Sequence, residues 1–335
     1  MGKLIIPENY KSALGIHETQ LAIKTVKDCF QNHLAQTLNL KRVSAPLFVF
    51  PETGLNDNLN GYERPVSFDI KETGKNAEVV HSLAKWKRQA LQRYDFHVGE
   101  GIYTDMDAIR RDEETDNLHS LYVDQWDWEL VIRKEDRNEE FLKQVVRKVY
   151  RALRQTEKYM AIQYDYIQEI LPKEITFLTT EELAEKFPEK TAKEREYWAA
   201  KEYGAVFLMH IGDSLPDGKP HDGRAPDYDD WHLNGDIIVY YPVLDIGMEL
   251  SSMGIRVDKE ALLTQLEKAG CPERAALPFQ KAVLEETIPF SIGGGIGQSR
   301  ICMFFLRKAH IGEVQVSLWP EEMTEEAKAG GIELL

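Results

Sequence analysis

The sequence is poor in cysteine: only Cys29, Cys271 and Cys302 occur among its 335 residues. They form no Cys-x-x-Cys pair, and no group of cysteines and histidines has the spacing of a zinc site. A disulfide framework and a structural zinc site are therefore excluded. So few cysteines are typical of a protein that works in the reducing cytoplasm.

Positive charge is also in short supply. The chain has 41 lysines and arginines against 56 aspartates and glutamates, which gives a formal net charge of −15 and an isoelectric point near 5.2. A protein that grips a nucleic-acid backbone needs a basic surface. We therefore expect no nucleic-acid partner.

Long apolar runs are absent as well. The longest, near 237–244 and 301–306, fall well short of the roughly 18 residues that a membrane-spanning helix needs. The first seven residues stop being apolar too early for a signal peptide. We therefore expect no membrane partner and a cytoplasmic location.

Hydrophobic periodicity divides the chain into helices and strands. Apolar residues return every three or four positions between 19 and 38, which predicts an amphipathic helix. Further helices are expected at 83–94, 139–171, 180–203, in the segment up to 286, and at 298–308. Strands are expected at 43–50, within a hairpin at 61–80 that turns at 73–76, and at 101–110, 121–131, 204–209, 236–241 and 246–257. Hairpins interrupted by helices predict one α+β domain over 1–335, built on an antiparallel sheet.

A glycine-rich run, 292–297, precedes the last of these helices. Gln298 stands where the third glycine of a dinucleotide fingerprint should be, so that function is not supported. We expect a tight turn that lets a nucleotide approach the backbone, with Arg300 beside it as a fixed positive charge. The alternative is an ordinary turn with a surface arginine.

The expected strand 121–131 carries polar residues on one face. Alternation places Val123, Gln125, Asp127 and Glu129 on the same side, and Arg110 ends the preceding strand. This pattern indicates a lined site, although a half-exposed sheet face would also produce it.

These segments together resemble the class II aminoacyl-tRNA synthetases. Residues 43–48 after a long helix are similar to motif 1, and 293–300 to motif 3. Arg110, the acidic loop after it and the following strand are similar to motif 2. Four longer segments resemble, more narrowly, the ammonia-dependent asparagine synthetases of the A type; they are 80–89, 122–129, 224–231 and 249–256.

The resemblance spans most of the chain and implies both a fold and a reaction. The fold would be a class II synthetase-like antiparallel sheet flanked by helices, in a homodimer. The partners would be L-aspartate, ATP and ammonia. The reaction would form asparagine through a β-aspartyl-adenylate and release AMP and diphosphate. None of the cysteines has the N-terminal position of a glutamine-hydrolysing amidotransferase, so free ammonia is expected.

The resemblance also implies a nucleotide site. Attack on the α-phosphate concentrates negative charge, which fixed cations and Mg²⁺ stabilise. Arg110 would hold the α-phosphate, Arg300 the other end of ATP, and Gly295 would admit the nucleotide. Val123 would pack against adenine, where related tRNA synthetases use an aromatic residue. The Mg²⁺ ligands would be Glu249 and Asp236, because this ion prefers oxygen.

The amino-acid site follows from a likeness to aspartyl-tRNA synthetases. The residues that would bind substrate are Ser82, Lys87, Gln125, Asp127, Asp229, Ser251, Ser252 and Arg256. Lys87 and Arg256 match the pair that clamps the side-chain carboxylate in those enzymes. An asparagine synthetase activates that carboxylate instead, so we hypothesise that the pair holds the α-carboxylate of a substrate turned end for end. Gln125, Asp127 and Asp229 would bind the α-ammonium or position the reacting carboxylate.

Ammonia must reach the adenylate as the neutral base, so an arriving ammonium ion needs a proton acceptor. Asp57, in the glycine-framed loop 53–61, is the candidate ammonium-binding residue. The same loop could close over the adenylate. The alternative is a turn aspartate without a catalytic role. His119 is a weaker candidate for a contact with the ATP phosphates.

Two other functions stay open at this point. A tRNA synthetase paralogue would need an anticodon-binding module, for which the expected helix near residue 19 leaves no room. A non-catalytic sensor could lose Arg110, Arg300 and Glu249 without penalty, yet the sequence contains all three. If the enzyme interpretation is right, Lys87, Arg110, Arg256 and Arg300 converge into a basic pocket.

Overall fold

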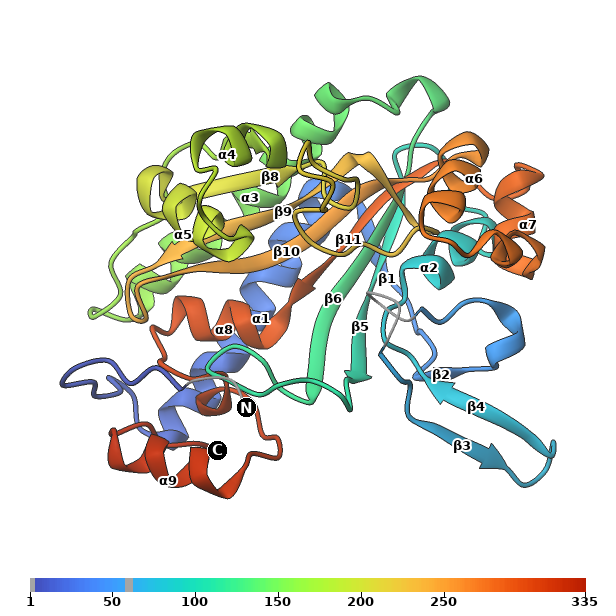
Figure 1. Ribbon diagram of the computed structural model, residues 1–335. Helices are drawn as coiled ribbons and strands as arrows, with labels where there is room; N and C mark the ends of the chain where they lie inside the picture. The colour runs from blue at the N-terminus through green and yellow to red at the C-terminus, as the bar shows by residue number, and fades with distance from the viewer. Residues whose placement is uncertain (1–3, 58–62) are drawn as a thin grey trace.

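One large sheet organises the molecule in the computed structural model, which describes residues 4–57 and 63–335 (Figure 1). Its order is β1-β5-β6-β11-β10-β9-β8-β7. The strands are β1 Leu40–Arg42, β5 Gly101–Ile109, β6 Tyr122–Val131, β7 Thr176–Thr179, β8 Ala205–Met209, β9 Asp229–Tyr241, β10 Ile246–Arg256 and β11 Ser291–Gly297. The six inner strands are antiparallel, and β1 and β7 run parallel to their neighbours at the two edges. The predicted antiparallel sheet is confirmed.

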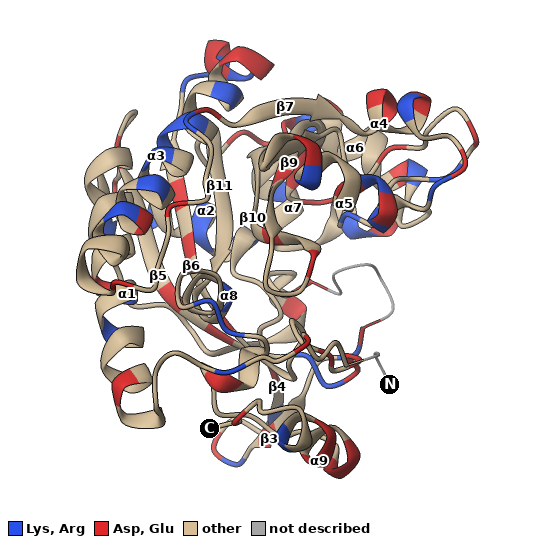
Figure 2. Ribbon diagram, turned by 90° about the vertical axis from the view of Figure 1, so that its left-hand side faces the viewer, with Lys and Arg blue, Asp and Glu red and all other residues tan. Residues whose placement is uncertain are grey.

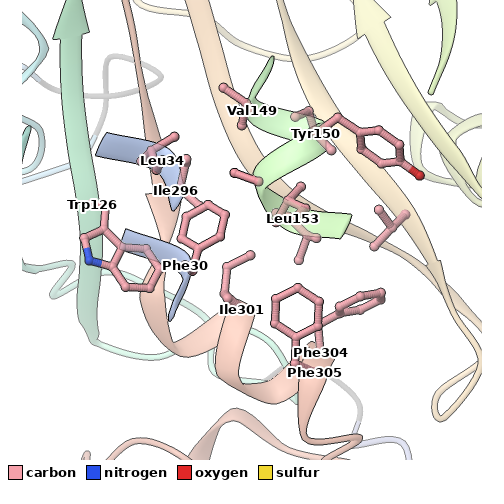
Figure 3. Close-up of a cluster of buried hydrophobic side chains, with 14 of the residues drawn as sticks. Phe30, Leu34, Trp126, Val149, Tyr150, Leu153, Ile296, Ile301, Phe304 and Phe305 are labelled. Atoms are coloured by element: carbon pink, nitrogen blue, oxygen red, sulfur yellow. The ribbon is translucent and has the colours of Figure 1, made fainter. Parts of the chain in front are cut away.

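Three helices cover one face of this sheet. They are α1 Ile16–Leu38, α3 Glu139–Gln163 and α8 Gln298–Phe305. Phe30 of α1 and Ile301 of α8 meet Trp126 of β6 in the main apolar core (Figure 3). The same side of β10 and β11 contributes Met253 and Ile296 to this core. The side chains of this face that belong to the core are buried.

The opposite face is covered only at its ends. Helix α2, Ala84–Arg93, packs on β5 and β6 through Leu91. Helices α4, Thr180–Lys186, and α5, Ala192–Tyr203, pack on β8 and β9 through Leu183 and Ala200. The middle strands β6, β11, β10 and β9 lie between α2 at one end of this face and α5 at the other (Figure 1).

Smaller elements complete the chain. A second sheet, β2-β4-β3, contains Phe48–Val49, Lys75–Val79 and Ser67–Ile70, and its hairpin turns at Gly74 as predicted. The remaining helices are α6 Lys259–Lys268, α7 Pro278–Leu284 and α9 Glu321–Ala329, with short 3₁₀ turns at Pro51–Thr53, Lys134–Asp136, Pro272–Ala276 and Ile311–Glu313. Helix α3 carries two acids in its first turn and mostly lysines and arginines after them on its exposed side, while its other side is buried in the core (Figure 2). None of the helices within the described residues combines the length and the apolar character needed to cross a membrane.

Several predicted elements differ from those observed. The glycine run is not a turn but part of strand β11. Strand β9 begins seven residues earlier than predicted, at Asp229, and the edge strand β7 was not predicted. The predicted helix 180–203 is two helices, because the segment after α4 contains Pro188, and α3 ends at Gln163.

The C-terminal segment buries a histidine. His310 is fully enclosed, its Nδ1 accepts a hydrogen bond from the Gly312 N–H (2.9 Å), and its ring lies 4.7 Å from that of Trp319. Burial lowers the pKa of His310 to about 4, against an opposing effect of Asp116. His310 is therefore neutral in the folded protein at pH 7.

We predict that this histidine destabilises the protein in mild acid. As the pH falls from 8 to 5, the unfolded chain protonates His310 near its ordinary pKa, whereas the folded chain does not, so stability is lost as the pH falls. The expected contribution is about 2 kcal/mol. His310→Asn keeps an acceptor for Gly312 without a titration. Urea unfolding at both pH values should show the smaller loss in this variant, and equal losses would contradict the prediction.

Candidate active site

A cavity of about 620 Å³ opens over the polar side of the middle strands. Thirteen of the predicted site residues line it: Ser82, Lys87, Arg110, Val123, Gln125, Asp127, Asp229, Asp236, Glu249, Ser252, Arg256, Gly295 and Arg300. His119 lines it as well. The four cations expected to converge, Lys87, Arg110, Arg256 and Arg300, are therefore in one pocket.

The pocket is not basic, however. Among the described residues that line it, eight are lysine or arginine and ten are aspartate or glutamate. The prediction of a basic pocket is wrong because each of the four cations has a carboxylate close by, on a strand for Lys87, Arg256 and Arg300 and in the following loop for Arg110. The site offers alternating charges, which suit a zwitterion and a metal-bound phosphate better than a simple anion.

The floor of the pocket is a buried charge network. Lys87, from α2, is 1% exposed, and its Nζ donates to Asp127 Oδ1 (2.8 Å) and to the Gly294 carbonyl (3.1 Å). Arg256, at the end of β10, donates through Nε and Nη2 to Glu129 (2.9 and 2.7 Å) and through Nη1 to Asp229. Each cation is thus held in place by carboxylates before any ligand binds.

Glu129 lies at the centre of this network. It is completely buried, accepts a hydrogen bond from the Ser291 hydroxyl (2.7 Å), and approaches Lys87 Nζ to 4.0 Å. Burial acts to raise the pKa of Glu129, but the charge and hydrogen bonds of Arg256, together with Lys87 and Ser291, outweigh it and the pKa is lowered. Burial and Arg256 lower the pKa of Lys87, whereas Asp127 and Glu129 oppose them.

The glycines of β11 make room for this network. A Cβ atom on Gly293 would lie 1.9 Å from Glu129 Oε2 and 2.5 Å from Arg256 Nη2. A Cβ atom on Gly295 would lie 2.5 Å from Gln125 Oε1. The glycines at these two positions therefore admit side chains from the neighbouring strands, rather than forming a turn under a nucleotide.

We predict that Gly293→Ala disrupts the floor of the pocket. The added methyl group overlaps the Glu129–Arg256 pair, so the free energy of unfolding should fall by about 2 kcal/mol and the KM for aspartate, the substrate that the family resemblance implies, should rise. Gly330→Ala is the control, since its Cβ would lie 2.5 Å from Ile6 Cγ2 and Gly330 does not line the pocket. It should lose stability without a comparable change in KM. Wild-type stability and KM in Gly293→Ala would contradict the prediction.

The other end of the pocket pairs two carboxylates with two arginines. Arg224 Nη2 donates to Asp236 Oδ1 (2.7 Å), and its Nη1 donates to the Ser252 hydroxyl. Arg300 Nη1 lies 3.6 Å from Glu249 Oε2 and donates to the Glu249 carbonyl (3.2 Å). Asp236 and Glu249 stand on neighbouring strands β9 and β10.

The pKa values of Asp236 and Glu249 are shifted in opposite directions. Burial raises the pKa of Asp236 to about 6; Arg224 opposes this rise, and Glu249 adds to it. Burial also acts to raise the pKa of Glu249, but Arg300 and other pocket cations outweigh it, so that pKa is lowered. Both acids carry charge at pH 7.

These two acids fit a shared Mg²⁺ site. Magnesium is commonly held by one or two carboxylates together with substrate phosphates. Within 4–57 and 63–335, no three histidine, cysteine, aspartate or glutamate side chains gather closely enough to hold a metal by themselves.

Two predicted site residues do not line the pocket. Ser251 is buried and is paired in the sheet with Ile237 and Ile296 of the main core, so its assignment to the substrate site stays a prediction that the pocket lining does not support. A register shift between Glu249 and Ser251 turns Ser252 toward the pocket instead.

Asp57 is buried behind the pocket rather than in its wall. Its backbone carbonyl lies 3.0 Å from His81 Nδ1. Burial and then the charge of Asp57 raise the pKa of Tyr228, which does line the pocket. Residues 58–62 of the expected closing loop lie outside the described residues.

Sequence reasoning missed Glu129, Arg224 and Lys193 as functional candidates. Alternation along β6 placed Glu129 on the polar face, but it could not reveal that Glu129 pairs with Arg256 of β10. Arg224 lies within a segment that carries the family resemblance. No sequence signal distinguishes Lys193 from other surface lysines on a helix.

Comparisons with known proteins fit this geometry. The sequence model of the AsnA family, described as aspartate-ammonia ligase, matches residues 17–331. The chain belongs to this family. It is 61% identical to an aspartate–ammonia ligase of Clostridium tetani, over 99% of this chain and 98% of that protein. It is 62% identical to one of Fusobacterium nucleatum, over 97% and 99%.

Solved structures show the same fold in synthetases. Asparaginyl-tRNA synthetase of Pyrococcus horikoshii, complexed with asparaginyl-adenylate, has a TM-score of 0.63 and 14% identity, over 90% of this chain and 70% of that chain. Aspartyl-tRNA synthetase of Entamoeba histolytica has a TM-score of 0.60 and 15% identity, over 89% and 58%. The class II synthetase-like fold is thereby confirmed. Membership of the ligase family confirms the predicted enzyme class and disfavours a non-catalytic sensor.

Proposed function

We propose that the chain makes asparagine by joining ammonia to the side-chain carboxylate of aspartate, which ATP first activates as an adenylate. The observation that carries this proposal is one pocket that holds two charge systems in a chain of the ligase family. One system, around Lys87 and Arg256, suits an amino acid. The other, around Asp236, Glu249 and Arg300, suits a metal-bound triphosphate.

In the first step, the β-carboxylate attacks the α-phosphate and diphosphate leaves. Negative charge builds up on the phosphate oxygens, and fixed cations stabilise it without reorganisation. Arg110 takes the α-phosphate and Arg300 the distal phosphates; Val123 and Gly295 border the nucleotide. Asp236 and Glu249 would hold Mg²⁺, which supplies a Lewis acid for the phosphate oxygens.

The aspartate is oriented by the floor of the pocket. Lys87 and Arg256 bind its α-carboxylate, and Asp127 and Asp229 bind its α-ammonium group. Ser82 and Gln125 complete this subsite, and Ser252, which stands opposite Asp236 and accepts a hydrogen bond from Arg224, borders it at the nucleotide end. The alternation of charge supports this arrangement, because a zwitterion matches both signs at once. With its α-carboxylate and α-ammonium groups bound in this way, the aspartate directs its β-carboxylate to the nucleotide end of the pocket.

In the second step, ammonia displaces AMP from the adenylate. Asp57 attracts the ammonium ion, which must lose a proton before the neutral base can attack. The charge of Asp57 acts on Tyr228, which lines the pocket, and this supports an electrostatic role for Asp57 although it is not part of the wall. The homodimer and the cytoplasmic location stay predictions of the family resemblance.

The test is a product assay. Purified protein incubated with aspartate, MgATP and ammonium should form asparagine and AMP in equal amounts. ADP in place of AMP would contradict the adenylate. Aminoacylated tRNA, formed when tRNA is added, would favour a synthetase paralogue. Glutamine in place of ammonium should give no asparagine.

A further inference from the structure

Arg224 is a pocket cation to which neither the sequence nor the proposed reaction gives a role. It lies on the loop between β8 and β9, and its guanidinium extends to Asp236 and Ser252, the residues that face each other across β9 and β10. Its side chain is 9% exposed and that of Asp236 is 15% exposed. The ion pair is therefore well shielded from water.

The guanidinium has donors in reserve. Its Nε is buried and has no hydrogen-bond partner among the described residues. Arginine carries five N–H donors, and the two Nη contacts use two of them. A side chain that lines a cavity of about 620 Å³, is anchored by an ion pair and keeps unused donors can bind a second, larger anion.

Arg224 also occupies the place where a cation is needed. Asp236 and Glu249 repel each other, and each is neutralised in this structure by an arginine, Arg224 on the first and Arg300 near the second. A divalent cation bound to Asp236 would take over the charge that Arg224 now balances. The two cations compete for the same carboxylate oxygen.

We propose that Arg224 and the divalent cation exchange at Asp236, and that the released guanidinium binds the phosphates of the incoming nucleotide. This inference rests on the proposed function and adds a coupling to it. Before a nucleotide binds, the Arg224–Asp236 ion pair keeps free metal from binding at Asp236. When metal and nucleotide arrive together, the cost of breaking the pair is offset by the new contact between Arg224 and phosphate.

The first test measures metal binding without nucleotide. Mn²⁺ titrated into the full-length protein and followed by electron paramagnetic resonance should bind about tenfold more tightly to Arg224→Gln than to wild type. Arg224→Lys keeps a cation and should stay within about twofold of wild type. Lys193→Gln controls for charge alone, since Lys193 acts on Glu249 but contacts Glu196 and Asp222. Equal gains in Arg224→Gln and Lys193→Gln would overturn the proposal.

The second test measures binding of ATP in EDTA by calorimetry. Asp236→Asn frees Arg224 and should strengthen metal-free ATP binding about tenfold. The same substitution made in Arg224→Gln should give a much smaller gain, because the group that it releases is absent. An equal gain in both backgrounds would mean a simple field effect and would overturn the exchange.

The two failures are separable. Suppose that wild-type protein binds MgATP and forms asparagine, but Arg224→Gln and Lys193→Gln gain equally in metal affinity and Asp236→Asn gains equally in both backgrounds. The exchange is then wrong and the proposed function stands. If wild-type protein neither binds MgATP nor forms asparagine, the proposed function is wrong and the exchange falls with it.

Discussion

Replacing Lys87 by methionine is expected to raise the KM for aspartate by about 100-fold, while the KM for ATP stays within about twofold of wild type. Methionine has nearly the length of lysine but no charge. The variant leaves Asp127 and Glu129 without the ammonium group that lies 2.8 and 4.0 Å from them, and it removes a cation from the proposed α-carboxylate subsite. Loss of a charged hydrogen bond in a buried site costs about 3 kcal/mol, which corresponds to that factor in affinity.

Lys85→Met is the matched control for this experiment. Lys85 lies two residues earlier on α2, is as buried as Lys87, and pairs with Asp227 at 3.1 Å, but it does not line the pocket. Both variants should therefore lose stability, and only Lys87→Met should lose affinity for aspartate. Steady-state kinetics with each substrate varied in turn gives the measurement. An unchanged KM and kcat in Lys87→Met would remove Lys87 from the substrate site.

The polar side of the sheet was predictable from the sequence because side chains along β6 alternate between its two faces, as expected for a strand. Val123, Gln125 and Asp127 line one pocket as their period of two requires. The family resemblance added the residues from distant segments that alternation cannot relate. It placed Lys87 of α2 and Arg256 of β10 together, and the structure does bring them to the same pocket wall.

The rest depends on contacts between strands that no local pattern reports. Glycines disfavour strands by propensity, so 292–297 predicts a turn; its pairing with β6 and β10 makes it a strand. Ser251 would share the face of Glu249 by alternation, but a register shift between them reverses it. The number of carboxylates around the cations likewise follows from packing, which is why a basic pocket was expected and a charge-balanced one was found.

Glu129 gives the second large effect. Glu129→Gln is expected to lower the free energy of unfolding by about 4 kcal/mol, because it leaves the buried cations of Lys87 and Arg256 with one carboxylate fewer. The glutamine has the same shape, so the loss measures charge rather than a cavity. Urea unfolding followed by circular dichroism checks it, and a change below about 1 kcal/mol would show that Asp127 and Asp229 suffice to balance both cations.

Ser291→Ala separates the hydrogen bond from the charge. It removes only the hydroxyl that donates to Glu129 Oε1 at 2.7 Å, and it should cost about 1 kcal/mol. If Arg256 needs Glu129 to hold its guanidinium toward aspartate, then Glu129→Gln raises the KM for aspartate and Ser291→Ala hardly does. Glu157→Gln completes the comparison: Glu157 is equally buried and pairs with Arg307 at 3.0 Å, but it lies away from the pocket. Its loss should lower stability and leave the KM for aspartate unchanged, because only the Glu129 pair orients a group that contacts the substrate.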